Sequence, residues 1–371
     1  MKTSSSLYSS RRSLCIATAS SLVFALSACG STDDSTNAAE ATAKSAIDAP
    51  GAYFDLSQWN ITLPIDANAD GKPDMVKVKD LQTYTHPDFF YLNEDKELVF
   101  TSPNVGVTTA NSKNARSELR QMSRGINTRI KTKAPKNNFA LAAHENAAAF
   151  AAIGGRMEAT LEVNHVALNS ARPEKYPSYS VVIGQIHAGN DPDRSKGFGY
   201  GNEPLKIFYK KFPDHDTGSV FWTYERNLPK ADPNRTDIAY PVWGNTWENS
   251  ADPGVDGIKL DESFSYVVNV YQNTMQLIFS APGRETVNYT INLANNVDAY
   301  GKGDEKDFEQ GYAGDWHYFK AGAYSQCNGG TSNPFWGTAC GGTGVWETDK
   351  ANGDYSQVTF SRLVLSEPKR F

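Results

Sequence analysis

Three short apolar segments separated by turn residues constrain the fold of this 371-residue chain most strongly. SYVVNVY, TMQLIFS and TVNYTINL occupy residues 265–271, 274–280 and 286–293. Only Gln272 and Asn273 separate the first two, and APGRE separates the second from the third. Segments of this length, rich in β-branched and aromatic residues and joined by short turns, are typical of antiparallel strands. The three segments therefore predict a β-meander.

Most other regular patterns in the chain also predict strands. ELVFTSP, GGRMEATLEVNHV, PLKIFYKK, SVFWTYER and YSQVTFSRLVLS all fit this pattern, whereas only AHENAAAFAAIG has helical character, as one turn or a loop. No internal repeat of about 20–50 residues is present. A content of 29 Gly, 18 Tyr and 18 Phe also suits a β-rich fold. We expect an all-β, antiparallel two-sheet sandwich of the jelly-roll type.

The first 28 residues are typical of an export signal. Three basic residues precede SLCIATASSLVFALSA, which is too short and too rich in small residues to span a membrane. The following LSAC resembles the bacterial lipobox, in which the cysteine, here Cys29, is lipidated. Because Gly30 rather than Asp follows it, we expect an exported protein anchored by lipid to the outer membrane, on either side. The alternative is an ordinary signal peptide cleaved after Ala28, which would give a secreted protein.

Processing divides the chain into three parts: residues 1–28 as signal, residues 29–50 as lipidated cysteine and flexible tether, and residues 51–371 as the folded domain. The tether is polar, Ala- and Ser-rich and without periodicity. Residues 1–28 contain three basic residues and no acidic one, so their removal changes the net charge from −6 to −9. This balance excludes general binding to nucleic acid, and a polyanionic ligand must find a local basic patch. We expect a monomer.

Two cysteines remain in the folded domain. Cys327 and Cys340 lie in a Gly-rich stretch, and exported proteins favour disulfides over free thiols. We therefore predict a Cys327–Cys340 disulfide.

Three of the predicted strands have one apolar face and one face crowded with hydrogen-bonding groups. They are ARSELRQ, IGQIHAG and HYFKAGAYSQ. Side chains two residues apart share a face of a strand. Each strand alone also fits a solvated face or a structural histidine, but together the groups can bind a carboxylate and transfer protons. The three polar faces consist of Arg116, Glu118 and Arg120; Gln185 and His187; and Tyr318, Lys320, Gly322, Tyr324 and Gln326.

RSELR, QIH and YFKAGAYSQ resemble the three signature blocks of family 7 polysaccharide lyases, the alginate lyases. FDLSQWNITLP and VTFSRLVLS resemble the two ends of that family's domain, so that the likeness covers residues 53–371. The resemblance implies a β-jelly roll with a substrate groove on the concave sheet. It also implies cleavage of the 1,4-glycosidic bonds of alginate by β-elimination, which gives 4,5-unsaturated uronate ends without a metal or a cofactor.

The resemblance also implies a role for each polar residue. Arg116 and Gln185 bind the uronate carboxylate, and His187 and Tyr324 transfer protons. With guluronate, His187 is the base and Tyr324 the acid, whereas with mannuronate Tyr324 can do both. Isoleucine in QIH accompanies acceptance of guluronate-containing blocks in this family. The remaining groups contact neighbouring sugars or, in the case of the glutamate, orient the arginines: Glu118, Arg120, Tyr318, Lys320 and Gln326.

The sequence also offers two other functions and one metal site as alternatives. A jelly-roll glycoside hydrolase needs two close carboxylates on a strand, and DEKDFEQ at 304–310 lacks that spacing. A non-catalytic glycan-binding lipoprotein does not need the histidine and tyrosine. Asp66, Asn68, Asp70 and Gly71 match the first half of a calcium loop, but its twelfth position is Lys77 rather than Glu. The alternative for this segment is an Asx-rich turn.

Two long segments, 188–261 and 300–350, flank the predicted catalytic blocks and predict loops that shape the binding site. We expect them to block one end of the cleft, so that small products are released from chain ends. The alternative is an open groove that cleaves internally. We expect four residues of these segments to contact terminal sugars: Tyr200, Trp222, Trp243 and Lys302.

Overall fold

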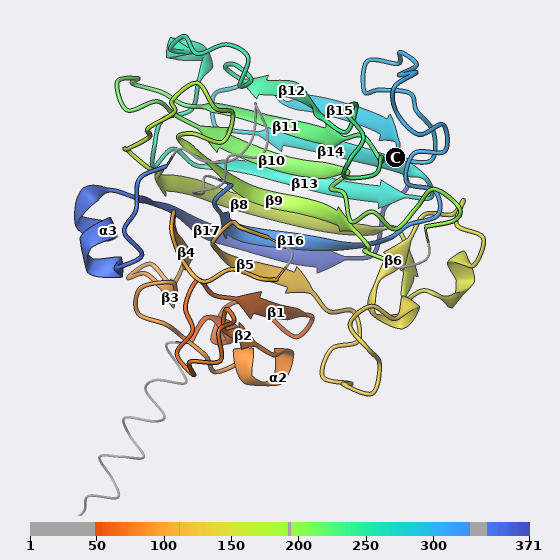
Figure 1. Cartoon of the computed structure of the whole chain (residues 1–371), viewed down its shortest axis with the longest axis horizontal. Coiled ribbons are helices and arrows are strands. Elements are labelled where there is room, and N and C mark those ends of the chain that lie inside the picture. Colours follow the sequence, from red (N-terminus) through yellow and green to blue (C-terminus); the bar gives the residue numbers. More distant parts are fainter. Residues whose placement is uncertain (1–48, 111, 192–193, 327–339) are drawn as a thin grey trace, which may run out of the picture. The chain divides into compact units, whose positions relative to one another are not determined.

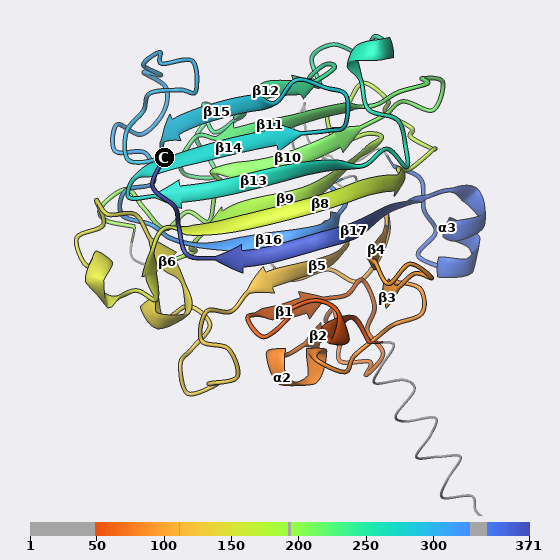
Figure 2. The ribbon, with the colours of Figure 1, turned by 180° about the vertical axis from the view of Figure 1, so that it is seen from behind.

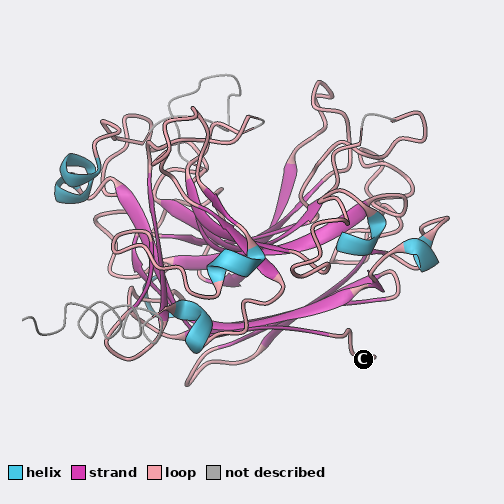
Figure 3. Ribbon diagram, turned by 90° about the horizontal axis from the view of Figure 1, so that it is seen from below, coloured by secondary structure: helices cyan, strands magenta, loops and turns pink. Residues whose placement is uncertain are grey.

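The computed structural model describes residues 49–110, 112–191, 194–326 and 340–371. Seventeen strands form two sheets, one of ten strands and one of seven, and every pairing except β6–β7 is antiparallel. Figure 1 looks onto the ten-stranded sheet, Figure 2 shows the seven-stranded sheet from behind, and Figure 3 shows the two layers from below. The predicted antiparallel two-sheet jelly roll is confirmed.

The ten-stranded sheet has the order β12-β11-β10-β9-β16-β5-β1-β2, with β6 paired to β16 and β7 to β6. Its strands are β12 (Asp237–Trp243), β11 (Ser219–Glu225), β10 (Leu205–Lys210), β9 (Ser180–Ala188), β16 (Trp316–Tyr324), β5 (Arg116–Gln121), β1 (Trp59–Thr62), β2 (Met75–Val76), β6 (Phe139–Ala140) and β7 (Ala152–Ile153).

The seven-stranded sheet has the order β15-β14-β13-β8-β17-β4-β3. Its strands are β15 (Val287–Asn292), β14 (Thr274–Ser280), β13 (Phe264–Tyr271), β8 (Gly155–His165), β17 (Tyr355–Ser366), β4 (Leu98–Pro103) and β3 (Phe90–Leu92). The predicted meander is β13-β14-β15, and β14 and β17 have the bounds read from the sequence.

Helical structure is sparse in the described residues. It consists of α2 (Val78–Leu81), α3 (Trp346–Asn352) and the 3-10 turns η1 (Pro50–Ala52), η2 (Pro135–Asn137), η3 (Ala147–Ala149) and η4 (Gly254–Asp256). The helical character of AHENAAAFAAIG amounts to η3 alone. Within the described parts of the chain, no helix has the length and apolar character needed to cross a membrane.

The core lies between the two sheets. Ile183 and Ile186 of β9 and Phe319 of β16 pack in the same fully buried cluster as Met157 of β8 and Phe360 of β17. Alternation along each strand sends every second side chain into this layer, and the register shift of β9 against β10 at Ile183 and Gly184 allows both isoleucines to face inward. The opposite face of β9 and β16 is thereby left to their polar residues.

The segment 188–261 contains more sheet than its composition suggested. DIAYPVW forms β12, which the sequence pattern did not reveal because Pro241 interrupts it. Proline removes a backbone donor and is tolerated at a sheet edge, where β12 lies. Trp222 and Trp243, which we expected to contact sugars, are buried in the core instead, at 0% and 7% exposure. Trp222 lies on an inward-facing position of β11, and a register shift of β12 against β11 places Trp243 opposite Val220, which is also in the core. The expectation that they contact sugars was therefore wrong.

Candidate active site

Three adjacent strands bring the predicted site residues together. β16 pairs with β5 on one side and with β9 on the other (Figure 1). In register, Lys320 lies between Arg120 and Gln185, Tyr324 lies opposite Arg116, and Tyr318 lies opposite His187. Strands far apart in the sequence thus present their polar faces as one continuous surface.

Glu118 is at the centre of this surface. Its carboxylate is buried and accepts hydrogen bonds from Arg116 Nη1 at 3.2 Å, from Gln185 Nε2 and from Lys320 Nζ. Two cations around one carboxylate leave one positive charge in excess. Burial, together with the charge of Arg116, lowers the pKa of Lys320 to about 8 against the opposing effect of Glu118. The predicted role of Glu118 in orienting its neighbours is consistent with these contacts.

Tyr324 is held by a cation and an amide. The guanidinium of Arg116 lies 4.1 Å from the centre of its ring, and Asn114 Nδ2 donates to its hydroxyl at 3.1 Å. Arg116 in turn donates to Ser112 Oγ at 2.8 Å. Asn114 and Ser112 were not identified from the sequence. Their only signal was their position just before the RSELR block.

A kink in β16 sets the position of Tyr324. The register of β16 against β9 shifts between Ala321 and Tyr324, and Gly322 has a φ of +139°. A Cβ at Gly322 would lie 2.5 Å from the carbonyl oxygen of Ser117. Only glycine fits this conformation and this close approach of β5.

His187 has an oxygen beside each ring nitrogen. Nδ1 lies 2.7 Å from the carbonyl oxygen of Ala188, and Nε2 lies 3.3 Å from Glu203 Oε1. Its ring is stacked on Tyr318, with 5.2 Å between centroids. Burial lowers the pKa of His187, Glu203 raises it, and the nearby Lys320 lowers it further. Glu203 was missed because it lies outside the three blocks, in the loop before β10.

The remaining predicted residues lie at the margins of the cluster. Arg120 is stacked over Tyr318, 4.0 Å from the ring centre, and donates to Asn138 Oδ1 at 2.9 Å. Gln326 lies two residues beyond the end of β16, so the strand alternation does not extend to it. Three buried polar atoms of the cluster have no hydrogen-bond partner in the described structure: Arg116 Nε, Gln185 Oε1 and Gln326 Oε1.

An aromatic wall covers the sheet face beyond Tyr324. We use this name for Tyr176, Val182, Phe208, Phe221 and Trp247, which form an apolar cluster with Tyr324. Tyr176 comes from the loop before β9 and Trp247 from the loop after β12, and their rings are stacked at 4.9 Å with an interplanar angle of 1°. Because Phe208 and Phe221 are fully buried beneath them, the strands β10 and β11 are closed to a ligand at this end.

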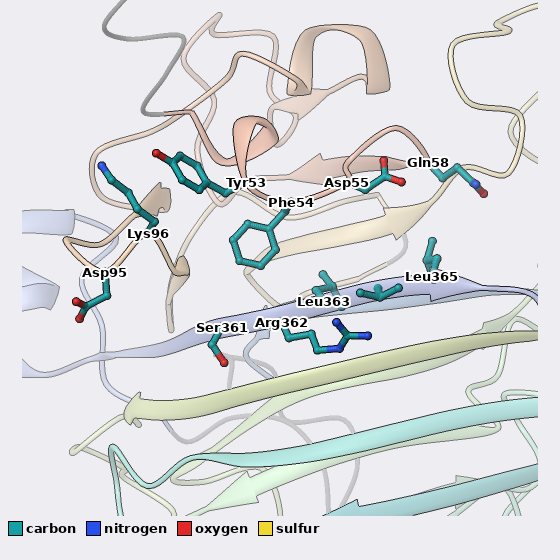
Figure 4. A pocket seen from close by; sticks show the side chains of 11 residues that line it. Tyr53, Phe54, Asp55, Gln58, Asp95, Lys96, Ser361, Arg362, Leu363 and Leu365 are labelled. Carbon is teal, nitrogen blue, oxygen red and sulfur yellow. The ribbon is translucent and has the colours of Figure 1, made fainter.

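A separate hollow of about 410 Å³ lies against the other sheet, between the segment before β1 and strand β17 (Figure 4). Tyr53, Phe54 and Asp55 line one side, and Leu363 and Leu365 line the other. None of the predicted site residues lines it. The polar cluster on β5, β9 and β16 therefore remains the candidate site.

Three further predictions concern residues outside this site: the lipid anchor, the disulfide and the calcium loop. Cys29 and Cys327 lie outside the described residues, so the lipid anchor and the Cys327–Cys340 disulfide stay predictions. In the Asp66 segment, Asp66 accepts from the backbone N–H groups of Asp70 and Gly71, at 2.9 and 2.7 Å. These are the hydrogen bonds of the Asx-rich turn alternative.

The fold and the cluster of Arg116, Gln185, His187 and Tyr324 define a jelly-roll polysaccharide lyase. Residues 54–367 match the family description of alginate lyases, and the chain belongs to this family. The chain is 32% identical over 330 residues to an alginate lyase of Klebsiella pneumoniae, a match that covers 86% of this chain and 92% of that protein.

Solved structures agree with this assignment. The crystal structure of the alginate lyase from Klebsiella pneumoniae matches with a TM-score of 0.66 at 31% identity, over 86% of this chain and 98% of that one. The exolytic PL7 alginate lyase from Zobellia galactanivorans matches with a TM-score of 0.69 at 32% identity, over 87% of this chain and 99% of that one.

Proposed function

We propose that this alginate lyase breaks the 1,4-glycosidic bond by β-elimination and leaves a 4,5-unsaturated uronate at the new end. The observation that carries the proposal is the cluster around Glu118, with Tyr324 and His187 on the same sheet face. Arg116 and Lys320 share the single carboxylate of Glu118, so these three groups together carry one positive charge in excess. That charge matches the single carboxylate of a uronate residue.

The chemistry requires charge neutralisation first. The C5 proton lies α to an ionised carboxylate and is very weakly acidic until donors neutralise that group. Arg116 Nε is a buried donor without a partner in the described structure and is available to the uronate carboxylate. Gln185 Oε1 is a buried acceptor without a partner there, and it can accept from a sugar hydroxyl. His187 takes the C5 proton, the C4–C5 double bond forms, and O4 leaves with a proton from Tyr324.

We further propose that the enzyme accepts guluronate-containing blocks. In guluronate, H5 and O4 lie on opposite faces of the ring, so the base and the acid must be different groups. His187 and Tyr324 come from different strands, β9 and β16, and this arrangement supplies two such groups. The family tendency of the isoleucine in QIH supports the same preference, although Ile186 itself points into the core.

We also propose that cleavage starts from chain ends. The aromatic wall fills the sheet face next to Tyr324, so only a few sugars fit beyond the cleaved bond at that end. The 32%-identical relative from Zobellia galactanivorans is described as exolytic, which supports the same mode of action here. We propose in addition that the mature protein is lipid-anchored through Cys29 to the outer membrane.

The elimination proposal is tested by incubating the full-length protein with alginate. We expect ultraviolet absorbance from the unsaturated uronate to increase in step with the number of new reducing ends. New reducing ends without that absorbance would show hydrolysis and overturn the proposal. Separate assays on polymannuronate, polyguluronate and mixed blocks test the substrate preference.

A further inference from the structure

Glu203 makes a contact with His187 that the proposed chemistry does not yet use. The ring of His187 lies between two acceptors, the Ala188 carbonyl at 2.7 Å from Nδ1 and Glu203 Oε1 at 3.3 Å from Nε2. A neutral imidazole has one N–H and can donate to only one of them. The shorter contact assigns that proton to Nδ1. Nε2 is then without a proton beside the carboxylate, and it becomes a donor to Glu203 when it gains one.

Glu203 is held in place as an anion. Lys206 Nζ lies 3.3 Å from Glu203 Oε2 and also 2.9 Å from Asp237 Oδ2. Burial opposes ionisation, but Lys206 and His187 lower the pKa of Glu203 below its ordinary value. Burial raises the pKa of the adjacent Glu225 well above its ordinary value. Lys206 and His187 therefore favour the ionised form of Glu203.

The other charged groups near His187 disfavour its cationic form. Lys320 of β16 and Arg116 of β5 both lower its pKa, and His317 of β16 is a further titratable neighbour. Tyr318 contributes only its stacked ring. Glu203 and the Ala188 carbonyl oppose these cations by raising the pKa of His187, and Glu203 has the larger effect.

We propose that Glu203 is a positioning residue for His187, which stabilises the imidazolium formed when Nε2 takes the C5 proton and fixes the orientation of that imidazolium. This inference rests on the proposed β-elimination. In that step the C5–H bond breaks and its electron pair forms the C4–C5 double bond. The C4–O4 bond breaks, O4 receives the proton of Tyr324, and the new Nε2–H donates to Glu203. By the general rule that the hydrogen bond at one ring nitrogen sets the tautomer, the Ala188 carbonyl places the resting proton on Nδ1, and Glu203 acts at Nε2.

The test is Glu203→Gln, which keeps the shape and removes the charge. The pKa of His187 should fall by about one unit or more, as expected for the loss of an opposite charge at this range. NMR titration of the histidine rings measures it directly, and His187→Asn assigns the signal among the six histidines. The acidic limb of kcat/KM on polyguluronate should move to lower pH by a similar amount, and kcat should fall about tenfold or more with little change in KM.

Asp237→Asn is the matched control, because Asp237 contacts Lys206 and, in the described structure, is not in contact with His187. An equal shift in this variant, or an unchanged His187 titration in Glu203→Gln, would overturn the proposal. If Glu203→Gln does not fold, Glu203→Asp withdraws the carboxylate by one methylene and should shift the titration in the same direction by less. The titration requires no substrate, so a failure of the lyase assignment would be distinguishable from a failure of this inference.

Discussion

The guanidinium carbon of Arg116 lies 4.1 Å from the centre of the Tyr324 ring, directly across the β5–β16 pairing. A cation over the ring stabilises the phenolate that forms when Tyr324 gives its proton to the leaving oxygen. The same guanidinium keeps its Nε without a partner in the described structure, so it is available to a uronate carboxylate. One arginine is therefore placed to serve both the bound substrate and the acid that acts on it.

Tyr324→Phe removes one oxygen and keeps the ring that packs against the aromatic wall. We expect kcat on alginate to fall about 10²- to 10⁴-fold, which is the usual contribution of a positioned acid, with binding of oligosaccharide and thermal stability nearly unchanged. Initial rates by absorbance and binding by calorimetry measure the two effects. Tyr91→Phe makes the same chemical change on the other sheet and should keep full activity. Wild-type turnover in Tyr324→Phe would remove this residue from the mechanism.

Lys320 should set an alkaline limit on activity. Burial lowers its pKa to about 8 from the usual value of about 10.4. Below pH 8 the charged lysine contributes to the excess positive charge around Glu118, and above pH 8 that charge is lost. We expect kcat/KM to decline above pH 8. In Lys320→Arg, whose side chain does not titrate in this range, the decline should move to higher pH. An unchanged pH profile in that variant would show that another group causes the decline of kcat/KM above pH 8.

The aromatic wall should determine where the polymer is cut. Tyr176→Ala removes the ring that is stacked on Trp247 and opens the sheet face beyond Tyr324. We expect a faster loss of alginate viscosity for each double bond formed, because internal sites then fit the groove. Tyr300→Ala, at an exposed tyrosine outside the wall, is the control. If the wild-type enzyme already collapses viscosity while few double bonds have formed, cleavage from chain ends is wrong.

The lipid anchor is tested at Cys29. Cys29→Ser should leave the precursor uncleaved or release the protein from the membrane fraction, because the thiol that accepts the lipid is absent. Fractionation followed by immunoblotting measures the distribution. Cys15→Ser, within the signal, is the control and should not change it. Membrane retention in Cys29→Ser would favour another mode of attachment.

The sequence alone determined which residues share a face. Side-chain direction in a strand depends only on the two-residue period, so the common face of Arg116, Glu118 and Arg120 was readable from the spacing. The burial of Ile186 behind Gln185 and His187 followed in the same way. The β-meander could also be predicted from local sequence, because strands joined by short turns pair with each other.

Tertiary structure decided which groups contact these residues and shift their pKa values. The order β9-β16-β5 joins segments more than a hundred residues apart, and nothing in the spacing of each block specifies that order. Glu203 reaches His187 only because β10 pairs with β9. Trp222 faces the core because the pairing of its strand in the sheet decides which face of that strand is covered by the other sheet. Local periodicity orients a side chain relative to its own strand, whereas its partners are set by long-range pairing and by the burial that the two sheets share.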